Sequence, residues 1–130
     1  MWSAACCALL VGVGVGARSG CLEYGRVMLT GTVARQTYPG PPDYRSIARG
    51  DEARVILVLL LEPGVCVVDP ESRHPRERYQ REIQLLLPPE LVAKQGNLLG
   101  KRVTFEGELI FAAAKHEKRL ALVVDRLIEP

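Results

Sequence analysis

The chain has 130 residues, 25% of them charged, and a formal net charge of +2 at pH 7. This length suits one domain with a modest core. The mild charge excludes nucleic acid as the default partner, because proteins that bind mainly by neutralising phosphates carry a much stronger basic surface.

Residues 1–17 contain no Asp, Glu, Lys or Arg and consist mostly of small and apolar residues. This pattern predicts a secretory signal peptide. Val15 and Ala17 supply the small residues that a signal peptidase accepts, so we expect cleavage near Ala17 and a single mature domain at residues 18–130. The protein is therefore expected to be periplasmic or secreted.

Two alternatives to a cleaved leader are a membrane anchor and a lipoprotein. The apolar run is shorter than the roughly 20 residues that a bilayer-spanning helix needs. Lipid attachment at Cys21 is disfavoured because Arg18 stands three residues before it, where such sites have an aliphatic residue. After leader removal we expect no membrane span.

Removal of the leader takes away Cys6 and Cys7 and leaves Cys21 and Cys66. An even pair of cysteines in an exported chain indicates one disulfide. The alternative is two buried free thiols.

The first predicted element is a strand at residues 26–35, which show a period-two pattern rich in β-branched residues. Gly31 within it indicates a bulge or sharp bend, which allows one strand to serve two sheets. Residues 38–51 follow with three prolines, which exclude a helix interior or a central strand, so we predict a shaped loop. Its end, residues 46–52, is predicted to form a short helical turn.

This loop carries the candidate binding residues, because binding groups tend to lie on loops that a rigid scaffold holds. The tyrosines have two interpretations: they pack on the domain and hold the loop in place, or they form a stacking surface for a sugar, peptide or base, with arginines at its rim. The acid at the end of the loop is expected to accept hydrogen bonds from loop amides or to cap the turn. The candidates are Tyr38, Tyr44, Arg45, Arg49 and Asp51.

The rest of the chain is predicted as further strands, a loop and one helix. A buried strand covers residues 53–62 and ends at a turn formed by Pro63 and Gly64. In order after that turn we expect a short strand at 65–68, a solvent-exposed loop at 69–80, a strand at 82–87, a helix at 90–99 closed by Gly100, a strand at 101–111, a basic turn at 112–118 and a last strand at 119–128.

This order predicts an all-β domain with one short helix, a small five-stranded Greek-key barrel that resembles the OB-fold. In OB-folds the ligand face lies on the middle strands, between the loop after the first strand and the loop before the last. Here those loops are residues 38–51 and 113–118.

A family resemblance rests on the loop motif and on the segments around both cysteines. The chain resembles a family of small exported bacterial proteins described as a domain of unknown function. The resemblance implies export, the pairing of Cys21 with Cys66 and a β-barrel, and it implies no activity. The residues that carry it are Tyr38, Pro39, Gly40, Pro41, Pro42, Asp43, Tyr44, Ser46, Ile47, Ala48, Gly50 and Asp51, with Cys21, Leu22 and Tyr24 before them and Val65, Cys66 and Val67 after them.

The sequence shows no catalytic or phosphate-binding motif. His74 and His116 are its only histidines, too few for a zinc site, so we expect no metal and no cofactor. We predict a non-catalytic exported module that contacts an envelope protein or glycan through residues 38–51 and the adjoining barrel face. The alternatives are a structural or accessory envelope protein without a ligand site, and a weak binder of single-stranded nucleic acid.

Overall fold

The computed structural model describes residues 20–73, 76–112 and 118–128, apart from the side chain of Arg78. Within these residues the chain is almost entirely strand. The elements in chain order are β1 (Cys21–Glu23), β2 (Gly25–Pro39), the 3-10 turn η1 (Ile47–Arg49), β3 (Ala53–Val68), β4 (Glu77–Leu86), α2 (Pro89–Val92), α3 (Gln95–Leu98), β5 (Arg102–Phe111) and β6 (Leu120–Ile128).

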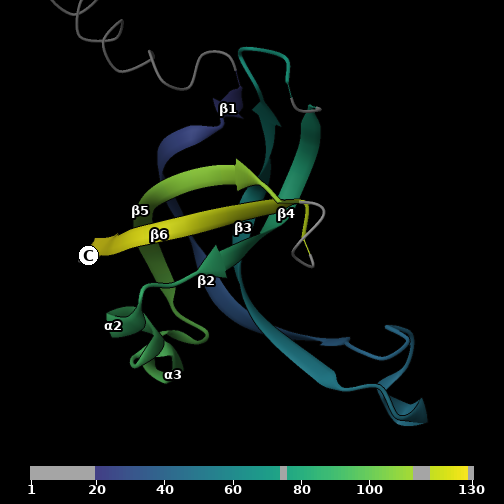
Figure 1. Cartoon of the computed structure of the whole chain (residues 1–130). Helices are drawn as coiled ribbons and strands as arrows, with labels where there is room; N and C mark the ends of the chain where they lie inside the picture. Colours follow the sequence, from purple (N-terminus) through teal and green to yellow (C-terminus); the bar gives the residue numbers. More distant parts are fainter. Residues whose placement is uncertain (1–19, 74–75, 113–117, 129–130) are drawn as a thin grey trace, which may run out of the picture.

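Five strands close into a barrel (Figure 1). Strand β3 pairs with β2 and β4, β2 pairs with β5, β5 pairs with β6, and β6 returns to β4 in the single parallel contact of the closed ring. This is the strand order of an OB-fold, with the helical segment between its third and fourth strands. The expected fold class is therefore confirmed: an all-β, five-stranded OB-like barrel.

The barrel interior is filled by the apolar residues of one face of each strand, because side chains alternate along a strand. Phe105 of β5 and Leu59 of β3 are completely buried there. The core continues across all five strands and under the helices, with Leu29, Val33, Leu61, Val67, Ile83, Leu85, Leu91, Leu98, Leu109, Leu120, Leu122 and Val124.

Gly31 lies where β2 changes partner, as its position in the predicted strand indicated. Residues from Gly25 to Thr32 pair with β5, and residues from Thr32 to Pro39 pair with β3. A Cβ at Gly31 would collide with the carbonyl group of Leu60. Only glycine allows the two strands to approach this closely.

Three predicted boundaries are wrong. Pro63 and Gly64 do not form a turn: β3 runs through them to Val68, and the missing proline donor is accommodated by shifts in the β3–β4 register. The loop expected at residues 69–80 is shorter, because the far half of β3 supplies partners for Glu77 and Gln80 of β4. Likewise, β2 extends to Pro39 because it gains β3 as a partner beyond the barrel.

The single predicted helix at residues 90–99 is also wrong, because two short helices, α2 and α3, replace it. After the bond from the amide of Ala93 to the carbonyl of Pro89, the amide of Lys94 bonds only three residues back, to Leu91. The chain tightens there and the first helix ends. Gly100 has a positive φ of 79° and follows α3, as expected for a residue that leaves a helix.

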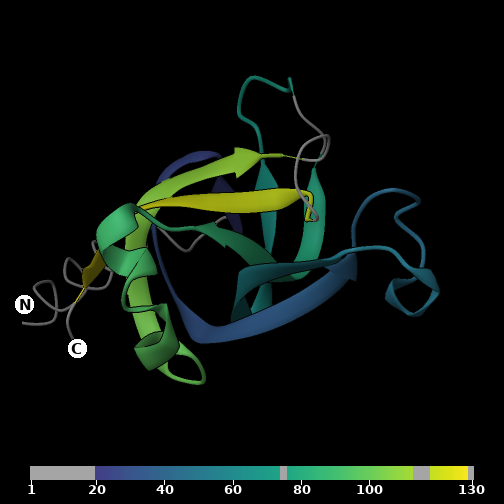
Figure 2. The ribbon, with the colours of Figure 1, turned by 60° about the horizontal axis from the view of Figure 1, so that its bottom comes forward.

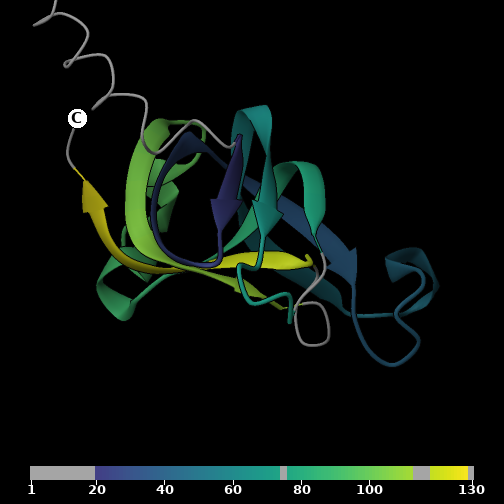
Figure 3. The same ribbon diagram turned by 90° about the horizontal axis from the view of Figure 1, so that it is seen from above.

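Cys21 and Cys66 are directly opposite one another in the parallel β1–β3 pair. Their Cα atoms lie 4.6 Å apart and their sulfur atoms are at bonding distance, so the expected pairing is confirmed. Seen from above, β1 lies beside the far end of β3 (Figure 3). The disulfide therefore joins the segment before the barrel to the barrel wall.

Candidate binding site at the tip of a projecting arm

The first two barrel strands continue beyond the barrel as a two-stranded arm, residues 35–57 (Figure 2). In the arm Tyr38 is opposite Arg54 and Pro39 is opposite Ala53. Strand β5 pairs with β2 only as far as Thr32, and β4 pairs with β3 only from Leu57 onward, so no described strand pairs with the arm as a third strand between these two residues. The arm carries its tip, residues 40–52, away from the barrel.

The tip is organised around the carboxylate of Asp51, which is 7% exposed. One carboxylate oxygen accepts a hydrogen bond from the amide of Asp43 at 3.0 Å. The other accepts from the amides of Arg45 at 2.8 Å and Ser46 at 2.9 Å. Hydrogen bonds from the amides of Ser46, Arg45 and Asp43, named from the largest effect to the smallest, lower the pKa of Asp51. The structure thus agrees with the predicted role of this acid as an acceptor for loop amides.

Backbone hydrogen bonds complete the tip. The amide of Gly40 bonds the carbonyl of Glu52 at 2.6 Å, and the amide of Glu52 bonds the carbonyl of Pro41 at 2.8 Å. Gly50 follows the turn η1 with a φ of 111°, a conformation that favours glycine. Within residues 40–52 only Gly40 and Asp51 are buried, so hydrogen bonds rather than an apolar core set the shape of the tip.

The tip displays apolar and cationic side chains to solvent. Tyr44 is 56% exposed and Ile47 is 42% exposed, and both Arg45 and Arg49 are exposed. Ile47 was not among the predicted site residues. The signal that could have identified Ile47 is that it is a lone β-branched residue within a short polar segment that has no strand alternation.

Tyr38 lies apart from the other predicted site residues, because it is on strand β2 and not in the loop. It belongs to a polar ring that consists of Gln36, Tyr38, Glu82 and Lys118. The hydroxyl group of Tyr38 donates to the Gln36 side-chain oxygen at 2.6 Å, and the Lys118 ammonium group lies 5.4 Å from the centre of the Tyr38 ring. The same ammonium group donates to Glu82 at 2.6 Å.

Charges in the polar ring support one another. Hydrogen bonds from Lys118 and then Gln36 lower the pKa of Glu82. Burial lowers the pKa of Lys118, but hydrogen bonds to Glu82 and Tyr38 outweigh burial and leave the pKa of Lys118 raised. The polar ring therefore ties the base of the arm to strand β4 and to the segment just before β6.

The polar ring lies on the outer face of strands β2 and β4, the face that holds ligands in OB-folds. Val58, at an outward position between Ala34 and Gln84, is completely buried although it is absent from the main core. Side chains of the chain itself thus cover this part of the face. Tyr38 is therefore a packing residue, whereas Tyr44 is a displayed one.

Next to the polar ring is an open depression of about 620 Å³, lined in part by Thr32, Leu60 and Arg102. Arg81 and Glu62 at its side form an ion pair of 2.6 Å. The opposed charges on this surface give it no dominant electrostatic sign.

The remaining expectations concern metals and membranes. The described residues contain no group of three side chains suited to hold a metal ion. His74 and His116 are outside the described residues, as are the predicted leader, residues 1–17, and most of the predicted second loop, residues 113–117. No helix among the described residues has the length and apolarity to cross a membrane.

Comparison with known proteins returned no family model, no curated protein and no solved structure that matches this chain.

Proposed function

We propose that this protein is an exported, non-catalytic binding module that contacts an envelope protein or glycan through the tip of the arm. The observation that carries the proposal is the combination of a tip whose backbone is fixed by Asp51 and side chains that the tip leaves in solvent. A surface that is ordered before binding loses little conformational entropy when a partner docks.

The chemistry of the tip suits a partner that offers apolar area and hydrogen-bond acceptors. Tyrosine and arginine are enriched among the residues that dominate binding energies, and Tyr44 is flanked by Arg45. The aromatic ring stacks on a sugar or packs on a peptide, and the guanidinium groups of Arg45 and Arg49 donate to carbonyl or carboxylate oxygens.

The burial pattern supports this function over that of a purely structural protein. If the tip served only to complete the core, its apolar side chains would be buried. None of the η1 residues is buried, and neither buried residue of the tip has an apolar side chain, because Gly40 has no side chain and Asp51 has a carboxylate. This supports a displayed surface.

A photo-crosslinking amino acid at position 44 tests the proposal in cells that express the full chain. Position 79 is the matched control, because Tyr79 is also exposed, at 82%, but lies on β4 outside the arm. We expect discrete crosslinked products from position 44 that are absent from position 79. Identical products, or none, at both positions would argue for the structural alternative.

Binding to isolated envelope fractions provides the second measurement. The variant Tyr44→Ala, combined with Ile47→Ala, is expected to lower retention by the protein or cell-wall glycan fraction by about thirtyfold, the scale of a hot-spot loss. Tyr79→Ala is expected to bind like the unaltered protein. Equal retention of all three proteins contradicts a site at the tip.

A further inference from the structure

The disulfide between Cys21 and Cys66 stands in surroundings that suit thiol–disulfide exchange. Both cysteines are partly exposed, and Cys66 lines an open depression of about 360 Å³ together with Gly64, Arg76 and Tyr79. A nucleophile that enters this depression comes up against Cys66. Cys21 is not among the residues that line it, so the depression leads to the disulfide from the side of Cys66.

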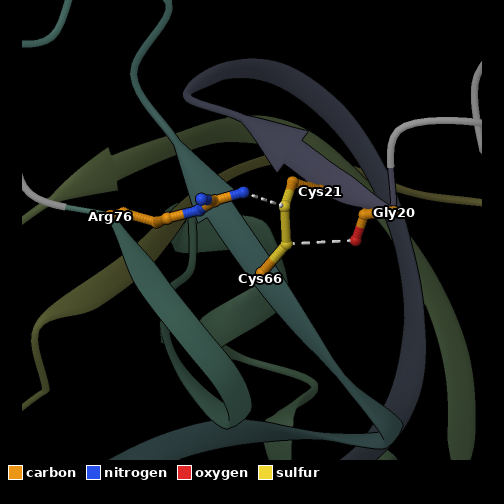
Figure 4. The surroundings of a disulfide bond; sticks show 4 residues. All are labelled: Gly20, Cys21, Cys66 and Arg76. Atoms are coloured by element: carbon orange, nitrogen blue, oxygen red, sulfur yellow. Dashed lines mark hydrogen bonds between the residues drawn. A yellow bond between two sulfur atoms is a disulfide. The ribbon is translucent and has the colours of Figure 1, made fainter.

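Each sulfur has a different neighbour (Figure 4). The guanidinium group of Arg76 lies 3.5 Å from the Cys21 sulfur. The carbonyl oxygen of Gly20 lies 3.1 Å from the Cys66 sulfur. A guanidinium group stabilises a thiolate, whereas a carbonyl oxygen accepts a hydrogen bond from a thiol.

The charge of Arg76 can stabilise a thiolate at Cys21. The next residue, Glu77, is the first residue of β4, and it is buried. Its carboxylate is 2.9 Å from the guanidinium group of Arg119, with which it forms an ion pair. Glu77 therefore does not neutralise Arg76.

From these contacts we propose that the Cys21–Cys66 disulfide is a site of reversible reduction by an external dithiol, with Cys66 as the sulfur that is attacked and Cys21 as the leaving group. The attacking thiolate forms a bond to the Cys66 sulfur, the Cys21–Cys66 bond breaks, and its electron pair goes to Cys21, beside Arg76. The second thiol of the dithiol, as a thiolate, then displaces Cys66. The dithiol is oxidised to a disulfide, and the two cysteines end reduced.

Reduction changes a defined part of the fold. Strand β1 has three residues, and within the described chain its only strand partner is β3. The disulfide is the covalent link that holds β1 there. Its reduction is expected to raise the hydrogen-exchange rate of Leu22 and Tyr24 while the barrel amides stay protected. The co-reactant class is a protein dithiol of the thiol–disulfide exchange type, independent of the partner proposed for the arm.

The test uses the oxidised full-length protein with a series of dithiothreitol concentrations under native conditions. We expect a reduction rate that rises in proportion to dithiothreitol. Arg76→Ala is expected to lower the rate constant about three- to tenfold, because a less stabilised thiolate leaves more slowly. Arg76→Lys retains the charge and should lose less. Arg73→Ala is the matched control, since Arg73 is exposed and pairs with Glu71 at 2.5 Å.

Reaction with glutathione, a monothiol, locates the attacked sulfur. After alkylation, mass spectrometry is expected to find glutathione on Cys66 and the alkyl group on Cys21. The proposal is overturned by glutathione on Cys21, by equal rates in the Arg76→Ala and Arg73→Ala proteins, or by a rate that does not depend on dithiothreitol. The last result means that reduction waits for unfolding. Two free thiols in the protein as purified also overturn it.

Discussion

The arm is a continuation of two of the five barrel strands, but the barrel and the arm are held by different forces. In the barrel, residues such as Leu59 and Phe105 are fully buried and packing decides the conformation. In the arm tip, Asp51 and backbone hydrogen bonds hold the chain, and the apolar side chains of Tyr44 and Ile47 face water. Because hydrogen bonds shape the tip, its side chains are free to serve in binding.

The largest expected effect comes from a change in the barrel core. Phe105→Ala is expected to lower the free energy of unfolding by about 3 to 5 kcal/mol, because it removes a buried ring and leaves a cavity. Denaturant unfolding measures this. If packing holds the barrel but not the tip, Phe105→Ala should not change local opening of the tip. The exchange rates of the tip amides in this variant should then rise only by the contribution of global unfolding. A tip that opens at much lower denaturant than the barrel in the unaltered protein would sharpen the contrast.

A change of Asp51, whose carboxylate organises the tip, is expected to act locally. Asp51→Asn replaces one acceptor oxygen by an amide group that faces the amides of Arg45 and Ser46. We expect hydrogen exchange of the tip amides to become faster by about tenfold or more, with little change in the barrel. Glu52→Gln is the control, because Glu52 is exposed and its hydrogen bonds in the tip come from the backbone. Equal effects of both changes would contradict the role of Asp51.

The carboxylate of Asp51 also predicts that the stability of the tip depends on pH. Because the pKa of Asp51 is lower in the folded protein than in the unfolded chain, its stabilising contribution is complete above the unfolded value of about 3.9. The contribution is lost as the pH falls through the lower folded value. Tip amides of the unaltered protein should therefore lose protection below about pH 4, whereas those of Asp51→Asn should show a flatter profile. Hydrogen exchange over an acidic pH series, corrected for the intrinsic exchange rate, checks this.

The polar ring joins the arm to the barrel. Substitutions in it are expected to have a smaller effect on the free energy of unfolding. A double-mutant cycle with Glu82→Gln and Lys118→Met is expected to yield a coupling free energy of about 0.5 to 1 kcal/mol, since the pair is partly exposed and screened by solvent. Thermal or denaturant unfolding of the four proteins measures it. A coupling near zero would mean that the contact of 2.6 Å does not help to hold the arm to the barrel.

The smallest effect on stability is expected at the displayed tyrosine. Tyr44→Ala should change the free energy of unfolding by less than about 0.5 kcal/mol, as exposed substitutions generally do. Tyr38→Ala should cost more, because it removes the hydrogen bond to Gln36 and the contact with Lys118. Comparison of the two melting temperatures checks the assignment of Tyr38 to packing and Tyr44 to display. Equal losses would erase the distinction.

Much of the barrel was predictable from residues 26–128. Alternating apolar residues located the strands at 26–35, 82–87 and 101–111, because burial on one face of a strand imposes a period of two. The pairing of Cys21 with Cys66 followed from their number and the expected leader. The turn at Pro63 was wrong, because a proline interrupts hydrogen bonding but does not stop a strand whose neighbours continue on both sides of it.

The candidate site was predictable as a segment but not residue by residue. The prolines of residues 38–51 located the loop, and Asp51 was recognised as a hydrogen-bond acceptor. The two tyrosines were treated alike, whereas Tyr38 faces Lys118 from a distant part of the chain and Tyr44 does not. Local sequence contains no signal for a contact between residues 80 positions apart.

By itself, the sequence determined the β-barrel, its strand faces and the glycine at which β2 bends, since these depend on local periodicity and on the size of a side chain. Tertiary structure alone decided that the first two barrel strands, β2 and β3, extend past the barrel as an arm. It also decided that the polar ring lies on the face that holds ligands in OB-folds. It also placed Arg76 beside the disulfide. These features arise from contacts between distant segments, whose geometry only the closed barrel fixes.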